Sequence, residues 1–270
     1  MEATLAESGE ETPGFWRRLD LKWLVIAACV GLVAWLALVP LGFLLWQSFF
    51  TPQTATKAAE LTLGNYVTVY TSAETLRLLG NSLRFGTGTA VFAFVLGAFL
   101  AWVNERTNTP FKSLFFALSL VPLVIPNILF TVAWILLASP KIGILNLALQ
   151  HWLETKTVFF NIYSMTGMIW VDGLHYSPMA FLLMTAAFRS MDPALEESAL
   201  MSGATLAQVA RRVTLPLAWP AVLASILILF VRAIESFEVP ALLGMPVGID
   251  VYTSAIYQAC LLYTSPSPRD

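Results

Sequence analysis

Residues 23–50 read WLVIAACVGLVAWLALVPLGFLLWQSFF and contain no Asp, Glu, Lys or Arg. A helix that crosses the hydrocarbon core of a bilayer needs about 20 mostly apolar residues. In lipid only helices and closed barrels satisfy every backbone polar group, and a barrel strand alternates apolar with polar residues. Because this stretch does not alternate, we predict that it forms a membrane-spanning helix.

Four further apolar stretches follow the first one, at residues 82–103, 113–138, 163–188 and 217–237. The whole chain is 57% hydrophobic and only 12% charged, with a mean hydropathy of +0.72. Soluble domains are typically about 25% charged, so this chain has too little charge to cover a soluble surface. We predict an all-α, polytopic transmembrane helical bundle with about five spans.

The charged residues outside these stretches give an orientation. Residues 1–14 are acidic, unlike a secretory signal, so we expect residues 1–22 to be a cytoplasmic tail. With this end inside, Lys and Arg are more frequent in the cytoplasmic connections than in the outer ones. The net charge of -2 gives no indication of a nucleic-acid partner. We therefore expect a multi-pass membrane protein with a cytoplasmic N-terminus.

Three prolines interrupt the predicted spans, Pro122 and Pro126 in the third and Pro178 in the fourth. Such prolines survive in lipid where neighbouring groups satisfy the freed carbonyls. Two interpretations fit: kinked helices around a transport pathway, or ordinary kinks in a packed bundle.

The connection between the fourth and fifth spans reads RSMDPALEESALMSGATLAQVARRVTLP, residues 189–216. Asp192 followed by Pro193 predicts a helix N-terminus, and Gly203 is the residue favoured just past a helix end. Thr205 and Gln208 have the spacing of a capping box, which predicts a second short helix. We expect that second helix to end at Leu215-Pro216.

This helix–turn–helix unit has a charged edge and a small apolar face. The charged side chains are Glu196, Glu197, Arg211 and Arg212, and the apolar ones are Leu195, Ala199, Leu206, Val209 and Val213. A rigid unit of this kind is suited to docking into a groove on a soluble partner. Two arginines tethered at a membrane are a poor phosphate-binding surface, so DNA reading is not expected.

The same segment resembles the EAA loop of ABC importer permeases, whose pattern is E-A-A, three residues, G, nine residues, I-x-L-P. Here Glu197-Ser198-Ala199 is followed at the same spacing by Gly203, Val213 and Leu215-Pro216. Ser198 replaces the central alanine and Val213 replaces isoleucine. The positions that the resemblance assigns to coupling are Glu196, Glu197, Ala199, Gly203, Val213, Leu215 and Pro216.

The resemblance implies a pair of coupling helices seated on a cytoplasmic ATPase dimer in a bacterial inner membrane. Glu197 is then expected to contact the ATPase, and Gly203 to form the turn between the helices. ATP and Mg would bind to the ATPase and no cofactor to this chain, which has no G-x-x-x-x-G-K-[ST] sequence. An extracytoplasmic solute-binding protein and a second permease half, fused or separate, complete the implied assembly.

A weaker similarity covers residues 75–259. Phrases such as NSLRFG at 81–86 and FVRAIESFEVPALLG at 230–244 resemble ferric-iron-type importer permeases, and polyamine-type permeases share much of this sequence character. The resemblance implies ferric iron as the cargo, with a polyamine or another small solute as the alternative.

Ionisable residues inside the predicted spans are candidates for function, because burying Asp, Lys or Arg in lipid costs at least about 2.5–3.5 kcal/mol each. They are Asp172, His175, Arg232, Glu235 and Glu238. In one interpretation the carboxylates attract a cationic cargo along the pathway. In the other, Arg232 pairs with Glu235, and Asp172 pairs with His175. Two residues make an incomplete metal site, so no metal ligand is assigned.

The end of the sequence needs separate treatment. Residues 239–259 read as an outer loop that leads into the start of a sixth span near Tyr252. Residues 260–270, CLLYTSPSPRD, resemble the translation of a sequencing adapter. We therefore expect residues 23–259 to be the permease domain and the sixth span to be cut short.

Two other classes of membrane protein are alternatives, a secondary transporter and an integral membrane enzyme. A secondary transporter would show inverted repeats with interrupted spans. A membrane enzyme would need a nucleophile with its base or a metal cluster, and the chain has only His151 and His175, in different segments. Neither class accounts for the spacing of residues 189–216.

Overall fold

The computed structural model describes residues 21–51 and 58–264, and the chain divides into a unit of residues 1–72 and a unit of residues 73–270. The regular elements of the described ranges are helices, joined in the first unit by one antiparallel bridge between Phe50 and Leu61. The predicted all-α class is confirmed. Most of the predicted tail, residues 1–20, lies outside the described residues.

The first unit contains α1 (Leu21–Ser48) and α2 (Gly64–Thr71). α1 is the predicted first span, and its apolar side chains are exposed over nearly its whole length, as suits a lipid environment. Asn65 anchors α2 by donating to the carbonyl oxygens of Ser48 and Phe50, at 3.0 and 2.9 Å.

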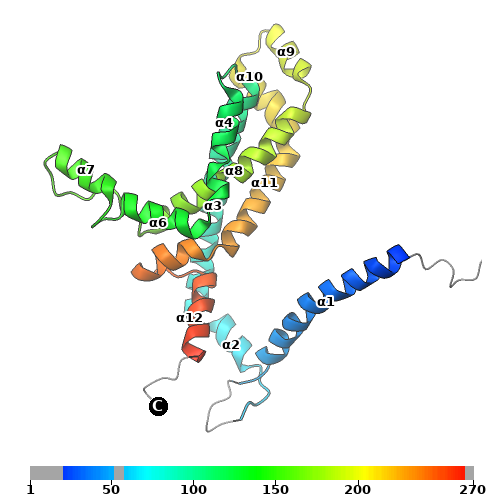
Figure 1. Ribbon diagram of the computed structural model, residues 1–270, viewed down its shortest axis with the longest axis vertical. Coiled ribbons are helices and arrows are strands. Elements are labelled where there is room, and N and C mark those ends of the chain that lie inside the picture. The colour runs from blue at the N-terminus through cyan, green and yellow to red at the C-terminus, as the bar shows by residue number, and fades with distance from the viewer. Residues whose placement is uncertain (1–20, 52–57, 265–270) are drawn as a thin grey trace, which may run out of the picture. The chain divides into compact units, whose positions relative to one another are not determined.

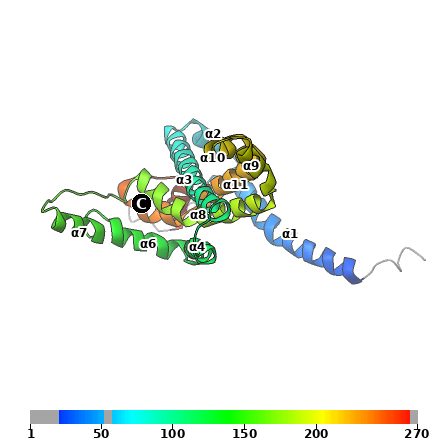
Figure 2. The same cartoon turned by 90° about the horizontal axis from the view of Figure 1, so that it is seen from above.

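Three long helices form the centre of the second unit: α3 (Ala73–Arg106), α8 (Met165–Ser190) and α11 (Leu215–Glu235). They run side by side in Figures 1 and 2. Gly97 allows α3 to approach α8 closely, because a Cβ there would overlap the carbonyl oxygen of Ser177. Small residues at such contacts are typical of helices packed in membranes.

Not all of the about five predicted spans are single apolar helices in the structure. In the described part of the chain three helices are long and apolar enough to cross a membrane: Lys22–Ser48, Ala73–Arg106 and Leu206–Glu235. α8 has 26 residues, a length of about 39 Å. It is not among the three, and it carries the polar residues Asp172 and His175. Both are buried against its neighbours, so α8 can be more polar than a helix that faces lipid.

The predicted third span, residues 113–138, is broken. α4 (Lys112–Ser119) and α5 (Val121–Val124) lie at 98° to α6 (Asn127–Ala138). Only when the two parts are taken together are they long and apolar enough to cross a membrane. Ile125 is extended, as expected for a residue before proline, and Pro126 is the N-cap residue of α6. The prolines therefore produce a sharp break where the sequence predicted a kink.

Pro178 has a milder effect, because α8 continues through it. Proline removes the N–H that would bond the carbonyl of Leu174. The Ser177 hydroxyl donates to that carbonyl instead, at 2.9 Å. The freed backbone group is thus satisfied within the helix.

The remaining elements lie at the two ends and one side of this bundle. α6 and α7 (Ile144–Trp152) project sideways from it, and α9 (Pro193–Met201) and α10 (Leu206–Val209) lie at one end (Figures 1 and 2). We call this end of the second unit the α9 end.

The expected outer loop after α11 is largely helical. A π-helical turn η3 (Pro240–Gly244) and a short helix η4 (Met245–Val247) precede α12 (Tyr252–Thr264), which begins where the sixth span was expected. Val239 and Leu243 are fully buried in the apolar core, so this segment is part of the bundle. Residues 265–270, in the segment interpreted as adapter sequence, lie outside the described residues.

Candidate functional site

The first helix of the 189–216 segment has the predicted ends. The Asp192 carboxylate accepts a hydrogen bond from the Ala194 N–H at 2.9 Å, and Pro193 is the first residue of α9. After the helix, Gly203 has φ +86°, a conformation that side chains rarely adopt. A Cβ at Gly203 would meet no neighbour, so backbone conformation rather than space favours glycine.

The second helix starts as predicted. Thr205 and Gln208 form a complete capping box: the Gln208 side chain accepts from the Thr205 N–H at 2.8 Å, and the Thr205 hydroxyl accepts from the Gln208 N–H at 3.3 Å. The turn between the helices is therefore fixed at both sides by local hydrogen bonds.

The predicted end of this helix at Leu215-Pro216 is wrong. α10 continues through a π-helical turn η2 (Ala210–Thr214) into α11, so that Leu206–Glu235 is one continuous helix. In a regular α-helix the ring of Pro216 would press on the carbonyl of Arg212. In η2 the Leu215 N–H donates to the carbonyl of Ala210, and this wider turn accommodates the proline. α10 is thereby joined rigidly to α11.

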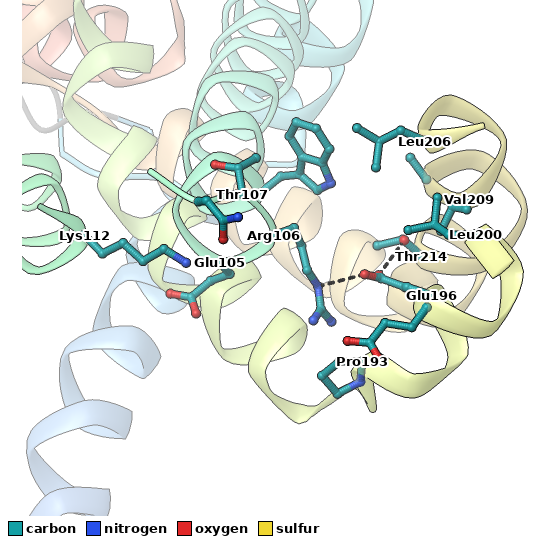
Figure 3. A pocket seen from close by; sticks show the side chains of 14 residues that line it. Glu105, Arg106, Thr107, Lys112, Pro193, Glu196, Leu200, Leu206, Val209 and Thr214 are labelled. Carbon is teal, nitrogen blue, oxygen red and sulfur yellow. Dashed lines mark hydrogen bonds and ion pairs between the residues drawn. The ribbon is translucent and has the colours of Figure 1, made fainter. Parts of the chain in front are cut away.

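The two neighbouring glutamates of α9 differ in their contacts. Glu196 is turned inward: its Oε2 lies 3.4 Å from Arg106 Nε, and its Oε1 accepts from the Thr214 hydroxyl at 2.7 Å (Figure 3). The exposed fractions of the Glu196 and Arg106 side chains are only 16% and 12%. Glu196 thus connects α9 to the end of α3 and to the start of α11.

Glu197, the glutamate of the EAA-like pattern, borders the same cleft as Arg106 and Glu196 but has no partner among the described residues there. It is exposed, and in the described part of the chain it makes no hydrogen bond or ion pair. Its carboxylate is available to a partner, whereas that of Glu196 is used inside the molecule.

The last turn of α3 holds the end of α8 as well. Arg106 also donates to the carbonyl oxygen of Phe188 at 2.8 Å. The preceding residue, Glu105, receives two hydrogen bonds from Arg189, at 2.9 and 3.0 Å. Nothing local in the sequence identifies the partners of Arg106 and Arg189.

A cleft of about 300 Å³ lies between the end of α3 with its following loop and the α9–α10 unit. Figure 3 shows Arg106 and Glu196 directed toward each other within it, with Leu206 and Val209 on the α10 side. Glu105 and Lys112 line its other side. The cleft separates two structural parts that are tied together mainly by polar contacts.

Several apolar side chains of the same unit are exposed, and two of them, Leu200 and Leu206, also line the cleft. Met201, the last residue of α9, is 89% exposed, and Leu195, Leu200 and Leu206 are between 43% and 55% exposed. Leu200 and Met201 were not among the predicted contact residues. Their position, shortly before the glycine that ends the helix, could have indicated that they are exposed apolar side chains. Of the predicted set, Val209 is buried, Ala199 and Val213 are half-buried, and Leu215 and Pro216 are exposed.

Comparison with known proteins identifies the family of this chain. A family described as binding-protein-dependent transport system inner membrane component matches residues 93–260, which include the entire 189–216 segment. The chain belongs to this family. The permease is thus a transport subunit, and the secondary-transporter and membrane-enzyme alternatives are set aside.

Individual relatives agree with the family. The permease is 28% identical to the inner membrane ABC transporter permease protein YdcU of Escherichia coli (strain K12), over 91% of this chain and 83% of YdcU. It is 27% identical to the molybdenum transport system permease protein ModB of the same organism, over 58% of this chain and 66% of ModB. It is 25% identical to the ferric transport system permease protein FbpB of Actinobacillus pleuropneumoniae, over 67% of this chain but only 26% of FbpB.

Solved structures confirm the fold. A crystal structure of a bacterial ABC transporter that imports alginate matches with a TM-score of 0.72 and 21% identity, over 92% of this chain and 87% of that chain. A second structure of an alginate transporter, in complex with its alginate pentasaccharide-bound periplasmic protein, matches with a TM-score of 0.70 and 23% identity, over 92% and 86%. The cargoes named among the relatives differ, so the resemblance to ferric-iron-type permeases does not identify the cargo.

The intramembrane polar residues of the permease fall into two places. Asp172 Oδ1 accepts from Ser236 Oγ at 3.0 Å and from Asn127 Nδ2 at 3.3 Å. The suggested pairing of Asp172 with His175 is therefore wrong. His175 packs against the rings of Phe130 and Tyr176 instead, and its Nδ1 has no hydrogen-bond partner among the described residues.

The second place is the end of α11. Arg232 and Glu235 form an ion pair at 3.8 Å, with exposed side-chain fractions of 59% and 62%. Glu238, three residues further on, is half-buried. In the described residues no three His, Cys, Asp or Glu side chains are grouped so as to hold a metal ion.

Proposed function

We propose that this chain forms the solute pathway of an ATP-driven importer and is coupled to a separate ATPase through its 189–216 segment. The observation that supports the coupling role is the difference in contacts between the two neighbouring glutamates of α9. Glu196 is bound by Arg106 and Thr214, while the side chains of Glu197 and Met201 are exposed and Glu197 is unpaired among the described residues. An exposed apolar anchor beside an unpaired carboxylate suits a docking surface on a soluble partner.

The contacts between α9 and the central helices suit the transmission of movement. A displacement of α9 would reach α3 and α8 through Arg106, and α11 through Thr214 and the continuous helix Leu206–Glu235. Interfaces and packed cores switch between discrete arrangements rather than deforming smoothly. Rigid attachment of α9 to all three central helices would therefore convert ATP-driven closure into a rearrangement of the pathway.

The assembly proposed around this chain has three partners. An ATPase dimer would bind ATP and Mg and would dock at the α9 end, which we place in the cytoplasm together with the N-terminus. A solute-binding protein would dock on the opposite side, as suggested by the alginate transporter solved with its periplasmic protein. A second permease half, fused or separate, would complete the pathway in the bacterial inner membrane.

For the cargo we propose a small hydrophilic solute delivered by the binding protein. Ferric iron is the first candidate to test, because of the resemblance of residues 75–259 to ferric-iron-type permeases. Because relatives are named for ferric, molybdenum and trehalose transport, other solutes are candidates as well. Uptake of radioactive ferric iron, molybdate and trehalose by cells with and without the gene would distinguish these candidates.

The docking role can be tested by copurification of the ATPase with the permease. Glu197→Lys and Met201→Asp should each lower the amount of bound ATPase by about tenfold or more, as expected for an interface anchor. Glu154→Lys is the matched control, since Glu154 is an exposed glutamate on the loop after α7. Wild-type levels of bound ATPase in both α9 variants would show that α9 is not the docking surface.

A further inference from the structure

Two helical segments of the second unit are interrupted at points far apart in the sequence. One is the 98° break at Ile125-Pro126, directly before Asn127 at the start of α6. The other is the end of α11, where Ser236 is extended with φ −61° and ψ 128° before the chain enters the buried segment that contains η3.

Both interruptions are bonded to a single oxygen atom. Asp172 Oδ1, on the continuous helix α8, accepts from Asn127 Nδ2 at 3.3 Å and from Ser236 Oγ at 3.0 Å. The carbonyl oxygen of Ser236 in turn accepts from the Thr253 hydroxyl of α12 at 2.9 Å. Through one carboxylate, α8 therefore holds the start of α6, the end of α11 and, indirectly, α12.

We infer that Asp172, Asn127 and Ser236 form a latch that makes the two helix interruptions move together during transport. The inference rests on the proposed function, because alternating access requires segments of the bundle to rotate against one another. Hinges are a few residues at element ends that absorb large changes in φ and ψ, and residues 125–127 and 236 are such places. The shared acceptor ties both places to α8, so they move together with α8, and a state in which either one moves away from α8 leaves its donor without a partner.

In this role Asp172 acts as a hydrogen-bond acceptor and not as a charge that binds cargo. Its side chain is fully buried, with 0% of the residue exposed, so a solute in the pathway has no access to it. Only Oδ1 is bonded, and Oδ2 has no hydrogen-bond partner among the described residues. Asparagine would preserve the oxygen, and the buried Asn127 Oδ1, which also has no partner among the described residues, is a potential acceptor for the new amide.

The experiment uses the complete transporter, with permease, ATPase and binding protein, in proteoliposomes. ATP hydrolysis is measured with and without the binding protein, so the cargo need not be known. Asp172→Asn should keep the stimulation close to wild type. Asn127→Ala and Ser236→Ala should each reduce the ratio of stimulated to basal hydrolysis by about fivefold, in the range of typical coupling energies. The double variant should be no worse than the more severe single one, because either change already separates the two interruptions.

Melting temperatures of the same variants in detergent separate coupling from simple support of the fold. A lower melting temperature with an unchanged stimulation ratio in Asn127→Ala and Ser236→Ala would overturn the latch. Loss of stimulation in Asp172→Asn, with normal assembly, would also overturn it and would indicate that the charge itself is needed. If the wild-type complex showed no stimulation, the proposed function would fail and the latch with it.

Discussion

Arg106 Nε lies 3.4 Å from Glu196 Oε2, and this contact joins the end of α3 to α9. Arg106 is held on its other side by the carbonyl oxygen of Phe188. One guanidinium group thus lies between α3, α8 and α9, in a place where both charged side chains are largely shielded from water. The contact gives the α9 end a fixed geometry beside the exposed Glu197.

Replacing Arg106 by methionine should destabilise this end of the bundle. The change preserves most of the apolar stem but leaves Glu196 largely buried without its cation, so the free energy of unfolding should fall by about 2 kcal/mol. Thermal unfolding in detergent measures this loss, and uptake should fall with it. Arg211→Met, at an exposed arginine of η2, is the control and should change stability by less than about 0.5 kcal/mol.

A double-mutant cycle with Glu196→Gln checks that the effect belongs to the pair. If the two side chains interact, the combined variant should be less destabilised than the sum of the single variants. Strict additivity would mean that Arg106 acts only through the carbonyl of Phe188.

The turn after α9 should tolerate substitutions in the order of their left-handed backbone preference. Gly203 has φ +86°, which asparagine adopts more readily than alanine and proline cannot adopt. We expect Gly203→Asn to retain most uptake, Gly203→Ala to lose about 1–2 kcal/mol of stability in the turn, and Gly203→Pro to abolish uptake. Uptake and membrane protein level are measured together, and a result in which alanine is better tolerated than asparagine would contradict this account.

The ion pair between Glu105 and Arg189 should contribute little by comparison. Its geometry is good, with two hydrogen bonds, but the Arg189 side chain is 59% exposed. Exposed pairs are typically worth less than about 1 kcal/mol, and salt screens them. Arg189→Ala should therefore lower the melting temperature only slightly at low salt and hardly at all in about 1 M salt.

Exchanging the two charges tests the same pair in the opposite sense. Glu105→Arg combined with Arg189→Glu should recover stability that either single change loses. Failure of the exchange would show that the neighbouring Asn104, which donates to Glu105 at 3.0 Å, requires a carboxylate at this position.

The close approach of α3 and α8 depends on one glycine of α3 and not on another. A Cβ at residue 97 would overlap the Ser177 carbonyl oxygen and Ala180, whereas a Cβ at residue 80 would meet nothing. Gly97→Ala should reduce the amount of folded permease and its melting temperature, because two helix backbones would have to separate. Gly80→Ala should be neutral or stabilise α3 by up to about 1 kcal/mol. Equal effects of the two substitutions would mean that the approach at Gly97 is not tight.

The sequence by itself determined the properties that depend on neighbouring residues. Apolar runs longer than any strand required membrane helices, and the ends of α9 and the start of α10 followed from Asp192, Gly203 and the Thr205–Gln208 capping box. These features are local, because a cap or a glycine turn needs only residues a few positions away. The spacing of residues 189–216 was for the same reason enough to indicate the family, which the match over 93–260 confirmed.

Only the tertiary structure decided which groups meet across the bundle. Glu196 and Glu197 are adjacent acids with the same local environment, and their different roles depend on Arg106 and Thr214, which other helices bring to one side of α9. One of the two interpretations paired Asp172 with His175 on its own helix, but Asp172 bonds Asn127 and Ser236 at two helix interruptions. The size of the break at Pro126 and the passage of α10 through η2 into α11 likewise depended on packing. Helical periodicity fixes which residues share a face, but the partner of that face is set by how distant helices pack, and no local pattern carries that information.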